Sequence, residues 1–195
     1  MRLVREVEPF SGASKLPDPP PHKKRIRYAP QRPFPAYRYV PGSGLPHPVN
    51  DPAGSLFHAG GAPAVEPWTP HIWPYIPDWL YGVDLFNHWY FWEAHEAWEG
   101  LWQVVDKTRP PAVFVQSLIQ LSAALLKVHL GSVGGATGLW SSAQQRLTAV
   151  AAEHKELMGL RPKAVLKAYT SYFAPLRKPV LPALDGHVPL LVLDL

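Results

Sequence analysis

The sequence predicts an all-α protein: a single bundle of about five helices with an extended, Pro-rich N-terminal arm packed on it. Seventeen of the 24 prolines fall in residues 1–77, where they exclude regular helix and central strand. From residue 78 onward, apolar residues recur at helical spacing between proline and glycine breaks. A chain of 195 residues is long enough for one core of moderate size, and too short for two full domains with linkers.

Residues 1–77 are the predicted arm, and their composition favours docking on the helices. Pro-rich linkers are usually poor in aromatic residues, yet this segment contains several Phe, Tyr and Trp side chains that are costly to leave in water. It carries nine Lys or Arg against five Asp or Glu, whereas residues 78–106 contain six acidic residues and no basic one. Opposite charges attract over such short ranges. The expected arm contacts are Tyr37, Arg38 and His47.

Five helices are expected between residues 78 and 175, the predicted helical domain. Asp78, after a proline, is the expected N-cap of the first, and Asn87–His88 is the expected break before the second. Pro110–Pro111 opens the third, because proline is tolerated in the first helical turn. The expected helices cover residues 78–87, 90–105, 112–130, 136–157 and 162–173.

The remaining segment, residues 176–195, is expected to be an extended C-terminal tail. Its apolar run at 188–193 is long enough to lie across the bundle as one extended segment. No partner strand for it is evident in the sequence. The tail is therefore predicted to pack on helices rather than to join a sheet.

Composition also excludes several functional classes. The chain contains no Cys, which excludes disulfide scaffolds, thiol nucleophiles and thiolate metal sites. No run approaches 18 consecutive apolar residues, and the first ten residues are charged where a signal peptide would be apolar. We therefore expect a cytoplasmic protein with no membrane partner, and composition alone predicts no cofactor.

The second expected helix carries the most informative polar residues. On a helical wheel, His95 and Glu99 fall in the same stripe as its aromatic residues, Glu96 lies at the edge of that stripe, and Glu93 lies farther round. We expect this stripe to face the core, so His95 and Glu99 are predicted to be buried side by side. A carboxylate among indole rings needs a partner, because desolvation disfavours its charged form.

The third expected helix offers partners for this pair. Gln116, Gln120 and Lys127 fall on one line along it. If the two helices pack antiparallel, the amides can bond His95 and Glu99, and Lys127 can neutralise a carboxylate. The predicted polar pocket comprises His95, Glu96, Glu99, Gln116, Gln120 and Lys127.

Three interpretations of this pocket remain open. The first is a buried hydrogen-bond network that fixes helix register. In the second, the chain is a binding or scaffold module and the pocket takes a small polar molecule or a partner protein. In the third, the chain is a metal-dependent hydrolase, with His95 and Glu99 as ligands of a divalent metal and Glu96 as general base. The motif is not His-Glu-x-x-His, and the spacing favours none of the possible third ligands, which are His47, His58 and His129.

Nucleic-acid binding through the arm is a further alternative. The run from Lys23 to Arg27 is basic and is followed by Tyr28, a residue that can stack on a base. Such runs are common on solvated tails, so this alternative ranks below the others. His88 and His154 are expected to be ordinary surface residues.

Three stretches resemble the bacterial and archaeal family called domain of unknown function 309. They are Leu-Phe-Asn at 85–87, a segment at 91–102 with the core Trp-Glu-Ala-His-Glu-x-x-Glu, and Phe-Val-Gln-Ser-Leu-Ile-Gln-Leu at 114–121. The similarity covers about residues 80–147. It implies a small helical bundle and no established activity.

Residues 35–54 are similar to an N-terminal extension of longer members of the same family, which implies that the arm belongs to the folded protein. Two departures from the family pattern stand out. The family usually has a glycine between Asn87 and the next helix, where this chain has His88–Trp89, and this difference predicts a less sharp helix break. The family also usually has a glycine in the third helix at the position of Ser117.

Overall fold

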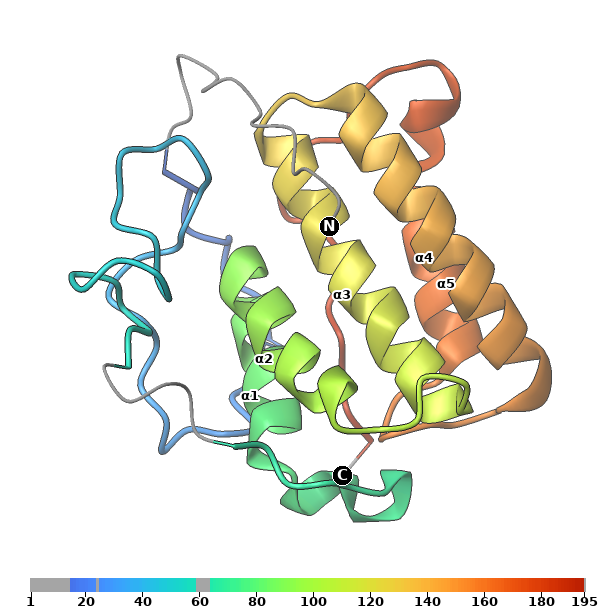
Figure 1. Ribbon diagram of the computed structural model, residues 1–195. Coiled ribbons are helices and arrows are strands. Elements are labelled where there is room, and N and C mark those ends of the chain that lie inside the picture. The colour runs from blue at the N-terminus through green and yellow to red at the C-terminus, as the bar shows by residue number, and fades with distance from the viewer. Residues whose placement is uncertain (1–14, 24, 59–63, 195) are drawn as a thin grey trace, which may run out of the picture.

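The computed structural model describes residues 15–23, 25–58 and 64–194, and this part of the chain is all-helical, as predicted (Figure 1). Five α-helices follow one another, a short 3-10 helix precedes them, and another follows them. No strand is found in the described ranges. The helices are η1 (Pro70–Tyr75), α1 (Pro77–Asn87), α2 (Phe91–Gln103), α3 (Pro110–His129), α4 (Val133–Glu153), α5 (Pro162–Tyr172) and η2 (Ala174–Arg177).

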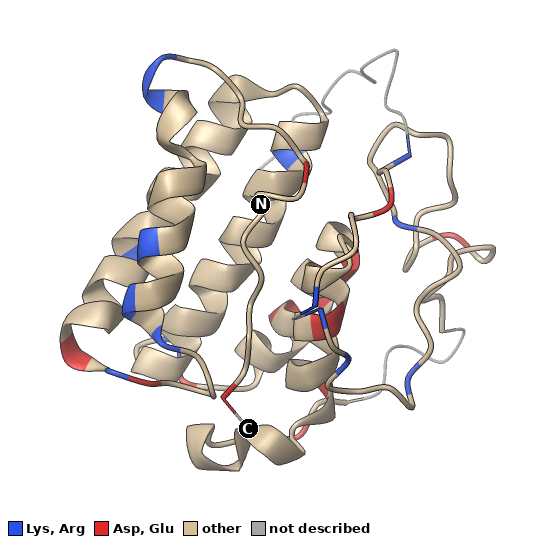
Figure 2. Cartoon of the chain, turned by 180° about the vertical axis from the view of Figure 1, so that it is seen from behind, with Lys and Arg blue, Asp and Glu red and all other residues tan. Residues whose placement is uncertain are grey.

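Consecutive helices pack on one another, and α3 lies between α2 and α4 (Figure 1). These three helices form the front layer in that view, with α1 behind α2 and α5 behind α4. Seen from behind, the C-terminal segment runs between α1 and α5, while the arm covers the outer side of α1 and α2 (Figure 2). The arm, the helices and the tail all contribute to one hydrophobic core, to which the arm supplies Ala29 and Val40 and the tail supplies Leu191 and Leu193.

Helix α3 is the one described helix whose length and composition would allow it to cross a membrane. Polar residues such as Gln116, Gln120 and Lys127 interrupt its apolar sequence, so it contains no uninterrupted apolar run of 18 residues. The central helix of a water-soluble bundle passes the same test, and 61% of the most apolar window of α3 is buried inside the protein. Its apolar surface is therefore largely used by the packing of α2 and α4 against it.

The break between α1 and α2 falls where it was predicted, but it is sharper than predicted. His88 ends α1, and Trp89 has a φ of 65°, in the left-handed region that glycine adopts at no steric cost. Its indole is 1% exposed and stacks on Phe91 at a centroid distance of 6.3 Å. Burial of the ring therefore offsets the cost of the backbone conformation that a glycine would otherwise supply.

Several helix ends differ from the prediction; α2 ends at Gln103 rather than at residue 105, and α4 begins at Val133 rather than at residue 136. Ile76 is the N-cap of α1, because Pro77 already occupies the first helical position; Asp78 lies in the first turn, where it pairs with Arg32 at 2.6 Å. Helix α4 ends at Glu153 rather than at residue 157. The following residues instead form a tight turn in which Leu157 and Leu160 exchange backbone hydrogen bonds of 2.8 and 3.1 Å.

The C-terminal tail is anchored on α1 by a single side chain. Asn87, 1% exposed, donates from Nδ2 to the Leu191 carbonyl at 2.8 Å and accepts from the Leu191 amide at Oδ1 at 2.9 Å. Leu191 is itself 1% exposed. The backbone of the tail is thus bonded to side chains rather than to a strand among the described residues.

We expect Asn87→Ala to lower the free energy of unfolding by about 2–4 kcal/mol, because it leaves two buried backbone groups without partners. Denaturant titration measures the loss, and hydrogen exchange at the Leu191 amide reports whether the tail opens. Asn50→Ala, at an exposed position, is the control and is expected to change stability by less than about 0.5 kcal/mol. Equal stability of the two variants would contradict an anchoring role for Asn87.

Candidate functional site

The acidic residues of α1 and α2 form two groups that face different surroundings. Asp84 and Glu93 are buried beneath the arm, at 0% and 1% exposure. His95, Glu96 and Glu99 are only partly covered, with side-chain exposures of 29%, 33% and 38%. Figure 2 shows acidic residues of these two helices beside basic residues of the arm. The first group holds the arm, and the second is the candidate site.

Asp84 is the centre of the arm's docking contacts. Its carboxylate accepts hydrogen bonds from Arg27 Nε at 2.8 Å, from the Tyr28 amide at 2.7 Å and from the Ala29 amide at 2.9 Å. One ion pair and two backbone donors together compensate for the desolvation of the carboxylate. The predicted docking of a basic arm on an acidic helix pair thus occurs, but its central contacts are made by Asp84 and Arg27, which the sequence analysis did not assign to docking.

Glu93 also contacts the arm, but it accepts fewer hydrogen bonds from it than Asp84 does. Oε1 accepts from the Tyr39 amide at 2.7 Å, while Oε2 is buried without a hydrogen-bond partner among the described residues. Burial raises the pKa of Glu93 to about 7, and the Tyr39 amide and the nearby Arg38 charge oppose this rise. Glu93 lies away from the face of α2 that packs on the bundle, as the helical wheel indicated, but it is buried because the arm creates a second covered face on α2.

Two of the three expected arm contacts touch the helices. Arg38 donates from Nε to the His88 carbonyl at 3.1 Å, and the His47 ring lies edge-on to Trp92 at a centroid distance of 5.1 Å. Tyr37 instead bonds within the arm, where its hydroxyl donates to a backbone carbonyl at 2.7 Å. His88, expected at the surface, is half-buried, and desolvation lowers the pKa of its imidazole.

The core face of α2 points away from the direction that the helical wheel indicated. Ala94, Trp98 and Leu101 define it, at 0%, 0% and 1% exposure. His95 and Glu99 do lie side by side, but at the edge of the core rather than inside it. The wheel was misleading because it counted every tryptophan of α2 as a core residue, although two of them are only partly buried.

His95, Glu96 and Glu99 form a compact group of possible metal ligands. His95 Nδ1 lies 3.2 Å from Glu96 Oε1, and Nε2 lies 3.6 Å from Glu99 Oε2. One ligand atom from each of the three residues can be chosen so that all lie within 4.8 Å of one another. His95 Nδ1 is buried and has no hydrogen-bond partner among the described residues.

The third possible ligand of this group is Glu96, which the sequence analysis considered as a general base. His47, His58 and His129 do not join the group in the described part of the chain. The Nδ1 atom of His47 accepts from two backbone amides, those of Val49 and Asn50, at 3.4 and 3.2 Å. That imidazole therefore serves the conformation of the arm.

The expected partners on α3 face α4 instead of α2. Gln116 and Gln120 accept hydrogen bonds from Arg146 of α4 at 2.8 and 3.2 Å. The stem of Lys127 lies against the start of α4, since a Cβ on Gly135 would be 3.1 Å from its Cγ and Cδ. The predicted pairing of these three residues with His95 and Glu99 is therefore replaced by pairing with α4, because α3 has a neighbour on each side.

A known protein family matches part of the helical bundle. Residues 79–139 match the family model described as Domain of unknown function (DUF309). This confirms the resemblance noted in the sequence, and the matched segment contains Asp84, Asn87, Glu93 and the residues of the candidate site. No curated protein and no solved structure shows significant similarity to the chain.

Proposed function

We propose that the DUF309 segment, residues 79–139 of this chain, is a helical binding module whose His95–Glu96–Glu99 group holds a divalent transition-metal ion. One observation carries the proposal. An imidazole nitrogen and two carboxylate oxygens from a single helix lie within 4.8 Å of one another. A helix turn places residues i and i+4 on the same side, which is why His95 and Glu99 meet without help from another element.

The charge around the group favours a cation. Residues 78–106 contain no Lys or Arg, and among the described ion pairs Glu96 and Glu99 pair only with His95. Two carboxylates within one helical turn carry negative charge that a divalent ion would neutralise. An imidazole ligand favours binding of zinc, manganese or a similar ion over calcium, which prefers oxygen ligands alone.

The partial exposure of the group favours a binding role over a purely structural one. Three protein ligands leave at least one coordination position open, whereas structural zinc sites are closed by four. The side chains are about one-third exposed, so water or a ligand atom from a partner can complete the coordination.

We expect calorimetric titration of chelator-treated protein with Zn²⁺ to show one high-affinity site per chain. His95→Ala and Glu99→Gln are each expected to weaken it by roughly 100-fold or more, because loss of an outer-shell partner alone weakens metal sites 10–100-fold. His187→Ala and Glu153→Gln, at exposed positions, are matched controls and should leave binding unchanged. Equal binding by all four variants, or no binding by the parent, would contradict the proposal.

Metal-assisted hydrolysis is the second candidate function, and the open coordination position favours it. A bound ion would lower the pKa of a water molecule at that position. Because Glu96 belongs to the ligand group, it can act as ligand or as general base, but not as both at once. Turnover of an activated ester or phosphoester by the Zn²⁺-loaded protein that is lost in His95→Ala would favour this function.

Nucleic-acid binding receives less support from the structure than from the sequence. Arg27 pairs with Asp84, and Arg25 donates from Nε to the Asn87 carbonyl at 2.8 Å. Lys24 lies outside the described residues. Two arginines of the basic run thus serve to dock the arm, which leaves fewer cations for phosphate.

A further inference from the structure

We infer that a second site lies at the end of the bundle, in a cleft between η1, the start of α3 and the turn after α4, and that it binds a small aromatic anion. The cleft has a volume of about 870 Å³, within the range of pockets that enclose small molecules. None of its lining residues belongs to the His95–Glu96–Glu99 group. The inference therefore stands independently of the proposed metal site.

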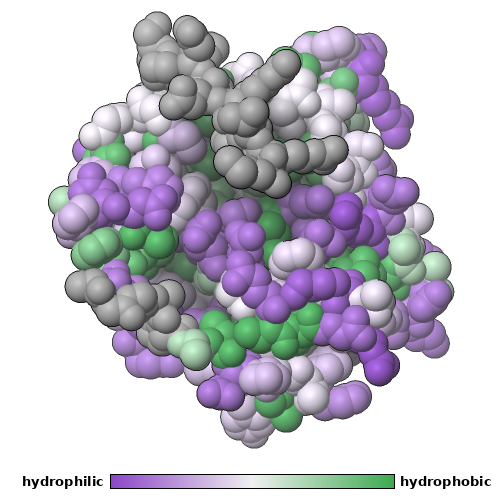
Figure 3. Space-filling view, in the orientation of Figure 1, coloured by the Kyte–Doolittle hydropathy of each residue, from purple (hydrophilic) through white to green (hydrophobic). Residues whose placement is uncertain are grey.

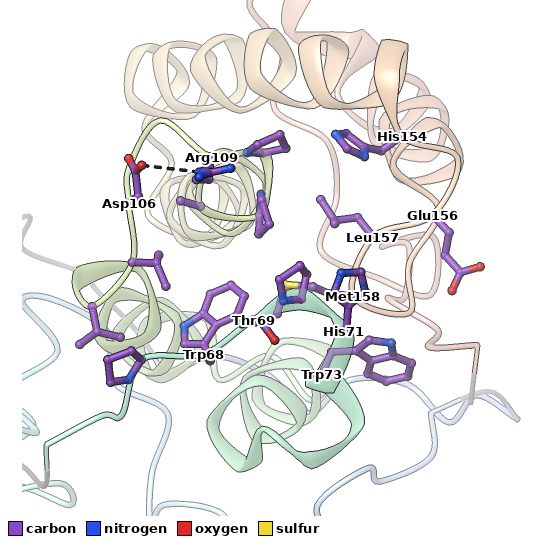
Figure 4. Close-up of a pocket in the computed structure, with 17 residues that line it drawn as sticks. Trp68, Thr69, His71, Trp73, Asp106, Arg109, His154, Glu156, Leu157 and Met158 are labelled. Atoms are coloured by element: carbon purple, nitrogen blue, oxygen red, sulfur yellow. Dashed lines mark ion pairs between the residues drawn. The ribbon is translucent and has the colours of Figure 1, made fainter.

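The walls of the cleft are apolar and flat. Figure 4 shows Trp68 and Trp73 on one side and Leu157 on another. Pro110 and Pro111, at the start of α3, also line the cleft. Indole and proline rings present flat surfaces that suit an aromatic ligand. In the space-filling view, the largest hydrophobic patch also lies towards this end of the molecule, over the lower part of α2 (Figure 3).

The walls are also held in place before any ligand arrives. Trp68 donates from Nε1 to the Leu101 carbonyl at 2.9 Å. Trp73 packs directly on Gly159, where a Cβ would lie 2.5 Å from the indole and where φ is +73°. Only glycine satisfies both conditions at this position without strain. A preformed cleft reduces the entropy lost on binding.

His154 supplies an unused polar atom in this cleft. It was expected to be an ordinary surface residue, but it is half-buried, and its Nε2 atom is buried with no hydrogen-bond partner among the described residues. Buried polar atoms are rarely left unpaired in folded proteins. A turn of the half-buried imidazole towards the cleft would let a polar group of a ligand satisfy this nitrogen.

Arg109 and the start of α3 give the cleft its preference for an anion. Arg109 lies at the rim, 77% exposed, and its Nε is 3.7 Å from Asp106. That carboxylate also accepts from the Thr108 amide and hydroxyl at 3.0 and 2.7 Å. A guanidinium carries five N–H donors, so several of them remain available for a ligand. Glu156 points away from the cleft in Figure 4. The positive end of the α3 dipole adds to the field at this end.

The test compares two fluorescent probes that share the same aromatic ring system. Anilinonaphthalene sulfonate carries a sulfonate, and phenylnaphthylamine is the same ring system without it. Both are titrated into the full-length protein, and thermal melts confirm that each variant is folded. We expect the sulfonate to bind at one site per chain, and Arg109→Gln to weaken it about tenfold, as expected for a charged hydrogen bond.

Three further variants test separately whether the site prefers an anion and whether the probes bind in this cleft. His154→Leu should weaken sulfonate binding several-fold, and Thr69→Trp, which fills the cleft, should weaken both probes by roughly tenfold or more. Arg177→Gln, at an exposed position in η2 at the far end of the bundle, is the matched control and should change neither. Unaltered sulfonate binding by Arg109→Gln overturns the anion preference, and unaltered binding of both probes by Thr69→Trp overturns the site.

Discussion

Replacing Asp84 with alanine is expected to lower the free energy of unfolding by about 3–5 kcal/mol. The change removes a fully buried carboxylate and leaves Arg27 and two backbone amides of the arm without their acceptor. Breaking a buried ion pair by removing one partner costs this much because the other charge remains desolvated. The arm would then lose its most strongly bonded contact with α1.

The measurement is denaturant unfolding, together with limited proteolysis of the arm. Asp78→Ala is the matched control, because Asp78 lies on the same helix and also pairs with an arm arginine, Arg32, at 2.6 Å. Both side chains of that pair are more than one-third exposed, so its loss should cost less than about 1 kcal/mol. Equal losses in the two variants would show that the arm is not held mainly through Asp84.

The helix positions could be predicted because their signals are local. Pro110 and Pro162 begin helices in the structure as they do in the prediction, since proline fixes its own φ and needs no amide partner in the first turn. The end of α4 could not be predicted in the same way. Residues 154–157 have ordinary helical propensity, and the chain turns there because Met158 and Gly159 adopt positive φ values of 53° and 73°.

The orientation of α2 could not be predicted because it depends on contacts distant in sequence. A helical wheel assumes one covered face, whereas α2 is covered by the bundle on one side and by the arm on another. Glu93 is buried by that second contact, through Tyr39, 54 residues away. Asp84 did leave a signal, since it is the only charged residue in the otherwise apolar or polar-neutral stretch 79–87, and residues 81–87 are all buried.

Glu93 is expected to make the stability of the protein fall as pH rises from about 4.5 to about 7. Burial raises the pKa of this carboxyl from 4.5 to about 7 in the folded state, so the folded protein binds the proton more tightly than the unfolded chain does. The stabilisation is complete below the unfolded pKa and is lost as pH rises through the folded one. The shift corresponds to about 3 kcal/mol between the two ends of this range.

Glu93→Gln isolates this contribution, because glutamine resembles the protonated acid and keeps an oxygen for the Tyr39 amide. Denaturant titrations in chelator-containing buffer at pH 5 and pH 8 should show similar stability for parent and variant at pH 5, and a variant more stable by up to about 3 kcal/mol at pH 8. Glu96→Gln, at a position one-third exposed on the same helix, should follow the parent at both pH values. A parent whose stability rises between pH 5 and pH 7, with the same slope in Glu93→Gln, would show that Glu93 stays ionised beneath the arm.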